Sequence, residues 1–171
     1  MRAIAIACLV LVSVMLAAPA VPASAQSITM TTTEKRMLRL INATRVRHGL
    51  HRLRVVASLE RAARRHSCDM LDRDYFSHYS YGGATFGARL VAFGYARAGT
   101  TSWRTGEVIG WGKGTAGTAR AIFNAWLRSP GHRKVIFTKC WRDVGVGAHK
   151  GGFGGLDCVR MFTVDFGRRT Y

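Results

Sequence analysis

The hydrophobic pattern of this 171-residue chain changes its period, from a helical spacing in the first two thirds to an alternation in the last third. Apolar side chains three and four residues apart predict helices at about 37–49, 58–73 and 115–127. Alternating residues predict two strands at 144–148 and 159–166, joined by a glycine-rich loop. Helices first and strands last favour an α+β fold with one antiparallel sheet.

Two details of this pattern indicate close packing. The second predicted helix lines one side with small or apolar residues and one histidine, namely Leu59, Ala62, Ala63, His66 and Met70. We therefore expect His66 to be a packing histidine. Gly145 and Gly147 alternate with apolar residues in the first predicted strand. This alternation is typical of a strand that lies close to another backbone.

The first 25 residues resemble a secretory signal. Arg2 gives a positive start, residues 4–18 are almost all apolar, and Ala23-Ser24-Ala25 supplies a small-residue cleavage site. The alternative is an uncleaved anchor, but the run is shorter than the roughly 20 residues of a spanning helix. No other segment could span a membrane. We expect a secreted protein, extracellular or periplasmic, that starts at Gln26, with a lead-in at 26–36 and a short tail at 168–171.

The chain carries 26 Lys and Arg against 9 Asp and Glu, a formal net charge of +17. Ten basic residues lie in one block, 35–65: Lys35, Arg36, Arg39, Arg45, Arg47, Arg52, Arg54, Arg61, Arg64 and Arg65. The block is either a solvated face of an exported basic protein or a surface that attracts polyanions such as anionic lipids and cell-wall polymers. It contains no aromatic residue for base stacking, so we do not expect specific nucleic-acid binding.

Removal of the signal leaves three cysteines, Cys68, Cys140 and Cys158. Export permits a disulfide, but an odd number leaves one thiol unpaired. Because Cys140 and Cys158 flank the two predicted strands of the hairpin, we predict a bridge between them and a free Cys68. The absence of a C-x-x-C spacing argues against a thiolate zinc site.

The sequence lacks the motifs of several enzyme classes, since it contains no H-E-x-x-H, G-x-S-x-G or S-x-x-K. The segment 112–115 reads Gly-Lys-Gly-Thr. It does not match a phosphate-binding loop, because Lys113 is followed by a glycine and no glycine lies five residues before Gly112. We predict that the glycines at 110, 112 and 114 form a flexible loop before the third helix.

Three polar residues beside turns are the candidates for chemistry: His78, Glu107 and His132. Two imidazoles and a carboxylate can form an open zinc-type site or a base with its orienting acid. The spacing alone cannot bring them together, and three separate surface residues are the alternative.

The chain resembles the bacterial CAP-domain (SCP-like) proteins, whose superfamily includes the cysteine-rich secretory proteins, antigen 5 and the plant pathogenesis-related proteins of group 1. The resemblance spans about residues 37–167 and rests on these segments in order: Leu40-Ile41-Asn42, His66-Ser67, Phe76-Ser77-His78, Gly106-Glu107, Ala125-Trp126, Ser129-Pro130-Gly131-His132-Arg133, Val144-Gly145-Val146-Gly147 and Asp165-Phe166-Gly167. It implies an α-β-α sandwich with a three-stranded antiparallel sheet between helix layers. It also implies that His78, Glu107 and His132 converge in a central cleft that binds zinc or another divalent cation in some members.

The chain departs from the family pattern at three places. Residues 127–129 contain no acid where the family pattern has a second glutamate. Val108 stands where the family has an asparagine after Gly-Glu, and Val135 stands where the bacterial Gly-His-Arg-x-Asn segment ends in asparagine. With one carboxylate, we expect only weak binding of a divalent ion. The expected function is a non-enzymatic binding module for a lipid, a sterol or a cell-surface polymer. The alternatives are a hydrolase that uses the His/Glu cleft or a metal, and a basic defence- or toxin-like effector that acts on anionic surfaces.

Overall fold

The computed structural model describes residues 29–96 and 99–171. The expected signal at 1–25 and the first residues of the lead-in lie outside the described residues. Within them the chain forms five α-helices, four β-strands and one 3-10 turn. None of the helices in the described ranges has the length and apolar character that would let it cross a membrane.

The sheet has four strands in the order β1-β3-β4-β2. Its strands are β1 (Arg54–Val55), β2 (Ser102–Lys113), β3 (Asp143–Phe153) and β4 (Leu156–Thr170). The pairs β3–β4 and β4–β2 are antiparallel, whereas β1 runs parallel to β3. The expectation of a three-stranded antiparallel sheet is therefore wrong in number and in orientation. A two-residue strand has no alternation of its own, so the sequence pattern cannot reveal β1.

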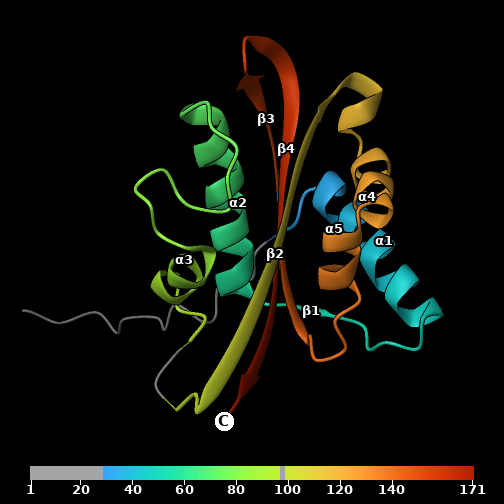
Figure 1. The fold of residues 1–171 in the computed structure, drawn as a ribbon, viewed down its shortest axis with the longest axis vertical. Helices are drawn as coiled ribbons and strands as arrows, with labels where there is room; N and C mark the ends of the chain where they lie inside the picture. The colour runs from blue at the N-terminus through green and yellow to red at the C-terminus, as the bar shows by residue number, and fades with distance from the viewer. Residues whose placement is uncertain (1–28, 97–98) are drawn as a thin grey trace, which may run out of the picture.

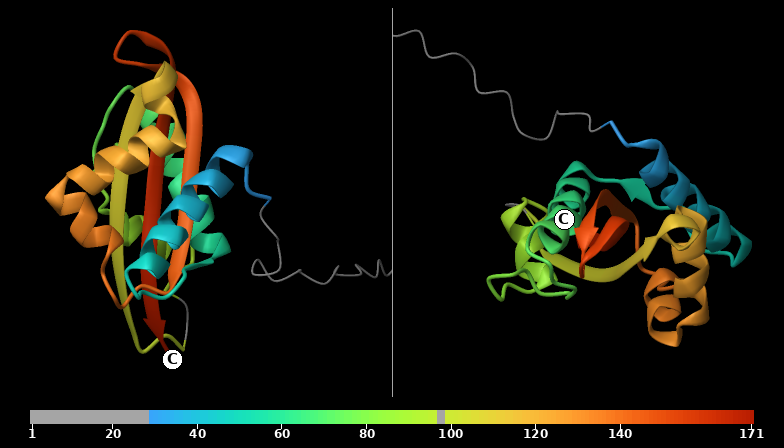
Figure 2. Two further views of the ribbon diagram at one scale, coloured as in Figure 1. Left: turned by 90° about the vertical axis from the view of Figure 1, so that its right-hand side faces the viewer. Right: turned by 90° about the horizontal axis from the view of Figure 1, so that it is seen from above.

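Helices cover both faces of the sheet (Figure 1). One face carries α2 (Ala57–Asp72) and α3 (Phe86–Ala92), and the other carries α1 (Thr32–Arg47), α4 (Ala119–Arg128) and α5 (Pro130–Ile136). In Figure 2 the left view looks onto the layer of α1, α4 and α5, and the right view shows the three layers from above. The predicted sandwich of helices around a sheet is confirmed.

The larger core lies between the sheet and the layer of α1, α4 and α5. It contains Met37 and Ile41 from α1, Phe123 and Trp126 from α4, and the apolar side chains of β3 and β4. A capping box fixes the start of α1, because the side chains of Thr31 and Glu34 each accept a hydrogen bond from the backbone N–H of the other.

The second helix and the first hairpin strand pack as the sequence predicts. The predicted face of α2, from Leu59 to Met70, is buried. A side chain at Gly145 would collide with the backbone of Leu59 and Glu60, and one at Gly147 with the backbone of Ala63. Only glycine therefore allows α2 to lie this close to β3.

The segment before α4 differs from the prediction. The glycines at 110 and 112 lie in β2, and the 3-10 turn Gly114–Gly117 follows, so α4 begins four residues later than expected. Pro130 ends α4 as predicted, but it also occupies the first turn of α5, where its missing N–H costs nothing.

The predicted bridge between Cys140 and Cys158 is wrong. The register pairs Asp143 with Gly167 at one end of the hairpin and Gly151 with Val159 near the other. Cys140 lies just before the first pair and Cys158 just before Val159, so about 25 Å of strand separates them at roughly 3.3 Å per residue. Cys68, Cys140 and Cys158 are all unpaired in the structure.

Candidate functional site

The candidate site lies along the outer edge of β2, where the two helix layers approach each other. β2 is the last strand of the sheet, and β4 is its partner on the inner side. On the outer side, the indole N–H of Trp126 donates a hydrogen bond of 2.9 Å to the carbonyl oxygen of Ile109. Two grooves are lined by residues of this strand. The smaller, of about 280 Å³, includes Ile109 and Trp126 in its lining, and the larger, of about 460 Å³, includes Thr105 and Glu107.

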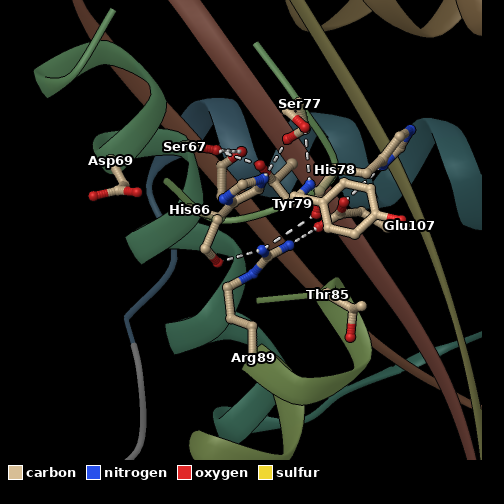
Figure 3. Close-up of polar contacts among 12 residues, drawn as sticks. His66, Ser67, Asp69, Ser77, His78, Tyr79, Thr85, Arg89 and Glu107 are labelled. Carbon is tan, nitrogen blue, oxygen red and sulfur yellow. Dashed lines mark hydrogen bonds and ion pairs between the residues drawn. The ribbon is translucent and has the colours of Figure 1, made fainter. Parts of the chain in front are cut away.

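Glu107 lies at the floor of the larger groove, and its side chain is fully buried. Its Oε1 atom lies 2.7 Å from Nδ1 of His78, and its Oε2 atom accepts a hydrogen bond from the guanidinium of Arg89. Figure 3 shows His78 and Arg89 reaching the carboxylate from the α2–α3 loop and from α3. Two of the three predicted residues, His78 and Glu107, are thus in direct contact.

His78 is the exposed member of this cluster, with 46 % of its side chain accessible. Its ring packs edge-on against Phe86, with 6.4 Å between ring centroids. Phe76, two residues earlier in the chain, is 45 % exposed and lines the smaller groove.

A second histidine positions the loop that carries His78. Nε2 of His66 lies 2.9 Å from the carbonyl oxygen of Ser77, and His66 is 1 % exposed. Burial, followed by the positive charge of Arg89, lowers the pKa of His66. The prediction of a packing histidine is confirmed, and its contact fixes the residue next to His78.

His132 belongs to the opposite helix layer and lines the smaller groove. Nδ1 of His132 lies 2.8 Å from the hydroxyl of Ser129, and the ring stacks on Trp126. Burial, followed by the positive charge of His78, lowers the pKa of His132. The two imidazoles therefore influence each other across the strand edge, while Glu107 is bonded to His78 and Arg89.

Arg89 is a site residue that sequence reasoning missed. It is 6 % exposed and also donates to the hydroxyl of Ser80. The sequence does contain a signal for Arg89, because this arginine lies within the otherwise apolar run Ala88–Ala92. A guanidinium that is buried with such a run requires an anionic or polar partner.

Asp165 is the second missed residue. It lies opposite Glu107 in the β2–β4 register and is completely buried. Neither of its carboxyl oxygens has a hydrogen-bond partner among the described residues. Burial, followed by the negative charge of Glu107, raises the pKa of Asp165 well above its ordinary value. This environment favours the protonated form of Asp165.

The residues of the cleft do not fit a three-ligand metal centre. Across 29–96 and 99–171, no three His, Cys, Asp or Glu side chains gather closely enough to hold an ion. The two oxygens of Glu107 are already bonded to His78 and Arg89, so the guanidinium occupies the place where a cation would neutralise this carboxylate. Zinc binding through His78 and His132 alone stays a prediction.

Comparison with known proteins gives a consistent result. The model of the cysteine-rich secretory protein family matches residues 38–166. Protein YkwD from Bacillus subtilis is 34 % identical over 140 residues, which are 77 % of this chain and 51 % of YkwD. The membrane protein YlbC from the same organism is 32 % identical over 120 residues, which are 70 % of this chain and 32 % of YlbC. The chain thus spans about half or less of the length of these curated relatives.

Solved structures share the fold. An outer surface protein from Borrelia burgdorferi has a TM-score of 0.68 at 23 % identity, covering 84 % of this chain and 97 % of the Borrelia chain. An extracellular protein with an SCP domain from Bacillus anthracis has a TM-score of 0.64 at 28 % identity, covering 83 % of this chain and 45 % of that protein. The three-layer fold, the His78–Glu107 contact and the family match over 38–166 lead to one conclusion: this chain belongs to the cysteine-rich secretory protein family, as a bacterial-type CAP domain.

Proposed function

We propose that this chain is an exported binding protein whose cleft along β2 holds an amphipathic, lipid-like ligand. The observation that carries the proposal is the larger groove, whose mainly apolar wall meets a charged floor. Phe86, Val135 and Trp141 contribute to the wall, while His78 and Glu107 lie at the polar end. Binding sites for small molecules commonly combine an apolar wall with a few polar groups that fix the orientation of the ligand.

The polar end suits a small head group. The ring of His78 is half exposed, and its Nδ1 atom is held by Glu107. The Nε2 atom is therefore the ring nitrogen that can meet a hydroxyl or carboxylate of the ligand. The smaller groove, farther along β2, has an apolar lining of its own that includes Phe76, Trp111 and Trp126. Export of the chain is supported by the expected signal at 1–25 and by the surface and extracellular descriptions of its structural neighbours.

Two variants of α5 test this proposal. Val135 lines the groove, whereas its neighbour Lys134 is exposed and lies outside it. Val135→Glu places a charge in the apolar wall and should weaken the binding of a fluorescent fatty acid or sterol by about tenfold or more, because burial of an unpaired charge is costly. Lys134→Glu should leave the affinity unchanged. Equal affinities in the two variants would place the ligand elsewhere.

The His78–Glu107 contact also supports a second candidate, a hydrolase in which His78 acts as a general base oriented by Glu107. The discriminating experiment is ester hydrolysis by the protein and by His78→Ala. The hydrolase predicts turnover that disappears in the variant. The binding protein predicts no turnover and a ligand that is recovered unchanged.

A further inference from the structure

The structure divides the basic block 35–65 into two groups of residues. Arg45 is completely buried and donates to the carbonyl oxygens of Ile136 and Thr138. Arg54, Arg64 and Arg65 form ion pairs with the acids of the fold. These four arginines serve the structure of the protein. The rest of the block remains available at the surface.

Part of the remaining block lines a groove between α1 and α4, with a volume of about 450 Å³. Figure 2 shows the two helices side by side on the outer face of the sandwich. Four arginines contribute to the lining, three from α1 and one from α4: Arg36, Arg39, Arg47 and Arg120. Between them lie Leu40, Phe123 and Leu127 together with the polar side chains of Thr44 and Asn124.

The arginines of this groove face no acid. All nine Asp and Glu residues of the chain lie within the described ranges, and none of them lines the groove. Glu34 is the acid of α1, but it is buried and paired with Arg64 of α2. The helices α4 and α5 contain no acid. The groove is therefore a concave surface of one charge sign, which attracts anions.

We propose that the α1–α4 groove binds a linear polymer that carries a phosphate group at each repeat and no nucleic-acid bases. Arg36 and Arg47 are separated by about 16 Å along α1, at roughly 1.5 Å per residue. One phosphate cannot reach both side chains, whereas successive phosphates along a chain can. The planar fork of arginine donates two parallel hydrogen bonds to a phosphate, which makes arginine the preferred residue for this contact.

The surroundings of the groove favour a polymer without bases over a membrane or a single-stranded nucleic acid. Among the exposed large apolar residues of the described ranges, Val46 belongs to α1 and none belongs to α4 or α5. A membrane-inserting face needs several such residues, and a surface that reads single-stranded nucleic acid needs exposed aromatic rings. The α4 residues that line this groove differ from those that line the smaller groove beside β2, so the site is independent of the cleft proposed above.

The test measures the binding of long-chain inorganic polyphosphate by calorimetry, at low and at high salt. The double variant Arg36→Gln/Arg120→Gln removes one arginine from each wall and should weaken binding by about tenfold or more. Arg104 and Arg168 are a matched pair, because they are exposed, lie opposite each other on β2 and β4, and do not line the groove. Arg104→Gln/Arg168→Gln removes the same charge and should change the affinity by less than about twofold.

The remaining arms of the experiment identify the ligand class. Orthophosphate at the same phosphate concentration should compete poorly, and His78→Ala should bind polyphosphate normally. An equal loss of affinity in the two double variants would overturn the proposal, because the net charge alone would then explain the binding. Efficient competition by orthophosphate would reduce the site to a single-anion site. Tighter binding to phosphatidylglycerol vesicles or to single-stranded DNA than to polyphosphate would overturn the assignment to a polymer without bases.

Discussion

Glu107 of β2 and Asp165 of β4 are directly opposed in the sheet, and both side chains are buried with a single arginine, Arg89, beside them. Two ionised carboxylates would exceed the charge of this guanidinium. Because Glu107 is bonded to His78 and Arg89, while Asp165 lacks a partner among the described residues, we expect Asp165 to carry a proton. The candidate site thus contains two neighbouring carboxyl groups in different surroundings.

Infrared spectroscopy can detect this proton. We expect a carbonyl band of a protonated carboxylic acid at neutral pH in the wild-type protein, and its disappearance in Asp165→Asn. Asp157 is exposed, so Asp157→Asn is the control that leaves the band in place. A spectrum without the band at neutral pH would show that Asp165 is ionised.

The raised pKa of Asp165 also predicts how stability depends on pH. In the unfolded chain this carboxyl ionises near its ordinary pKa of about 3.9, whereas the folded chain keeps the proton to higher pH. The contribution of Asp165 to the free energy of unfolding therefore falls as the pH rises from about 4 towards the folded pKa. In Asp165→Asn this pH-dependent decrease in the free energy of unfolding is absent, because asparagine does not ionise.

Urea denaturation at a series of pH values measures the effect. The free energy of unfolding of Asp165→Asn, relative to the wild type, should increase as the pH rises above about 4. A constant difference over this range would contradict the prediction.

Arg89 should be required for stability because it neutralises Glu107. Arg89→Ala leaves a buried carboxylate without its cation and is expected to cost about 3–5 kcal/mol of folding free energy. Glu107→Gln in the same chain removes the unneutralised carboxylate. The double variant should therefore lose less folding free energy than the sum of the losses in the two single variants. Urea denaturation of the four proteins gives the coupling energy, and Arg104→Ala serves as an exposed control. Additive losses would show that the two residues act separately.

We predict that zinc binding depends on the two imidazoles and not on Glu107. We expect weak binding at about pH 7.5 that is abolished in His78→Ala/His132→Ala and largely kept in Glu107→Gln, whose carboxylate is engaged by Arg89 in the wild type. Binding should weaken at about pH 5, where protons compete for the ring nitrogens. Calorimetry checks each point. Undiminished affinity in the double histidine variant would move the site to other residues, with His48 and His51 the first candidates.

The close approach of α2 to β3 makes a further prediction. Gly147→Ala would push a methyl group into the backbone of Ala63 and should destabilise the fold by about 3 kcal/mol or more. Gly152 lies on the same strand and has room for a methyl group, so Gly152→Ala is the matched control and should change stability by less than about 1 kcal/mol. Thermal denaturation that gives the two variants equal midpoints would refute the packing argument.

The sequence revealed those features that follow a regular spacing. The buried face of α2 and the glycine alternation of β3 were predicted correctly because each repeats with the period of its own element. The contact between His78 and Glu107 followed from the family resemblance and not from spacing. Residue order along the chain carries no direct information on which strands become neighbours.

The errors have a common physical origin in long-range packing. The glycines near the end of β2 favour a loop when only the sequence is considered. In the structure, Trp141 packs directly on Gly106 and Trp126 on Gly110, so both positions require glycine within the strand. The β2–β4 register places Asp165 opposite Glu107, and the docking of α3 brings Arg89 to the carboxylate of Glu107. Neither relationship leaves a local pattern in the sequence.

The hydrogen bond from Trp126 to Ile109 has a consequence for the behaviour of the protein at high concentration. The outer edge of a sheet offers backbone groups that a strand from another molecule can bind, which is a common route to aggregation. Here a buried indole occupies a carbonyl oxygen in the middle of that edge, and α4 holds the indole in place. An incoming strand would have to expel a tryptophan from the core before it could extend the sheet. One side chain thus lines the smaller groove and blocks this part of the sheet edge.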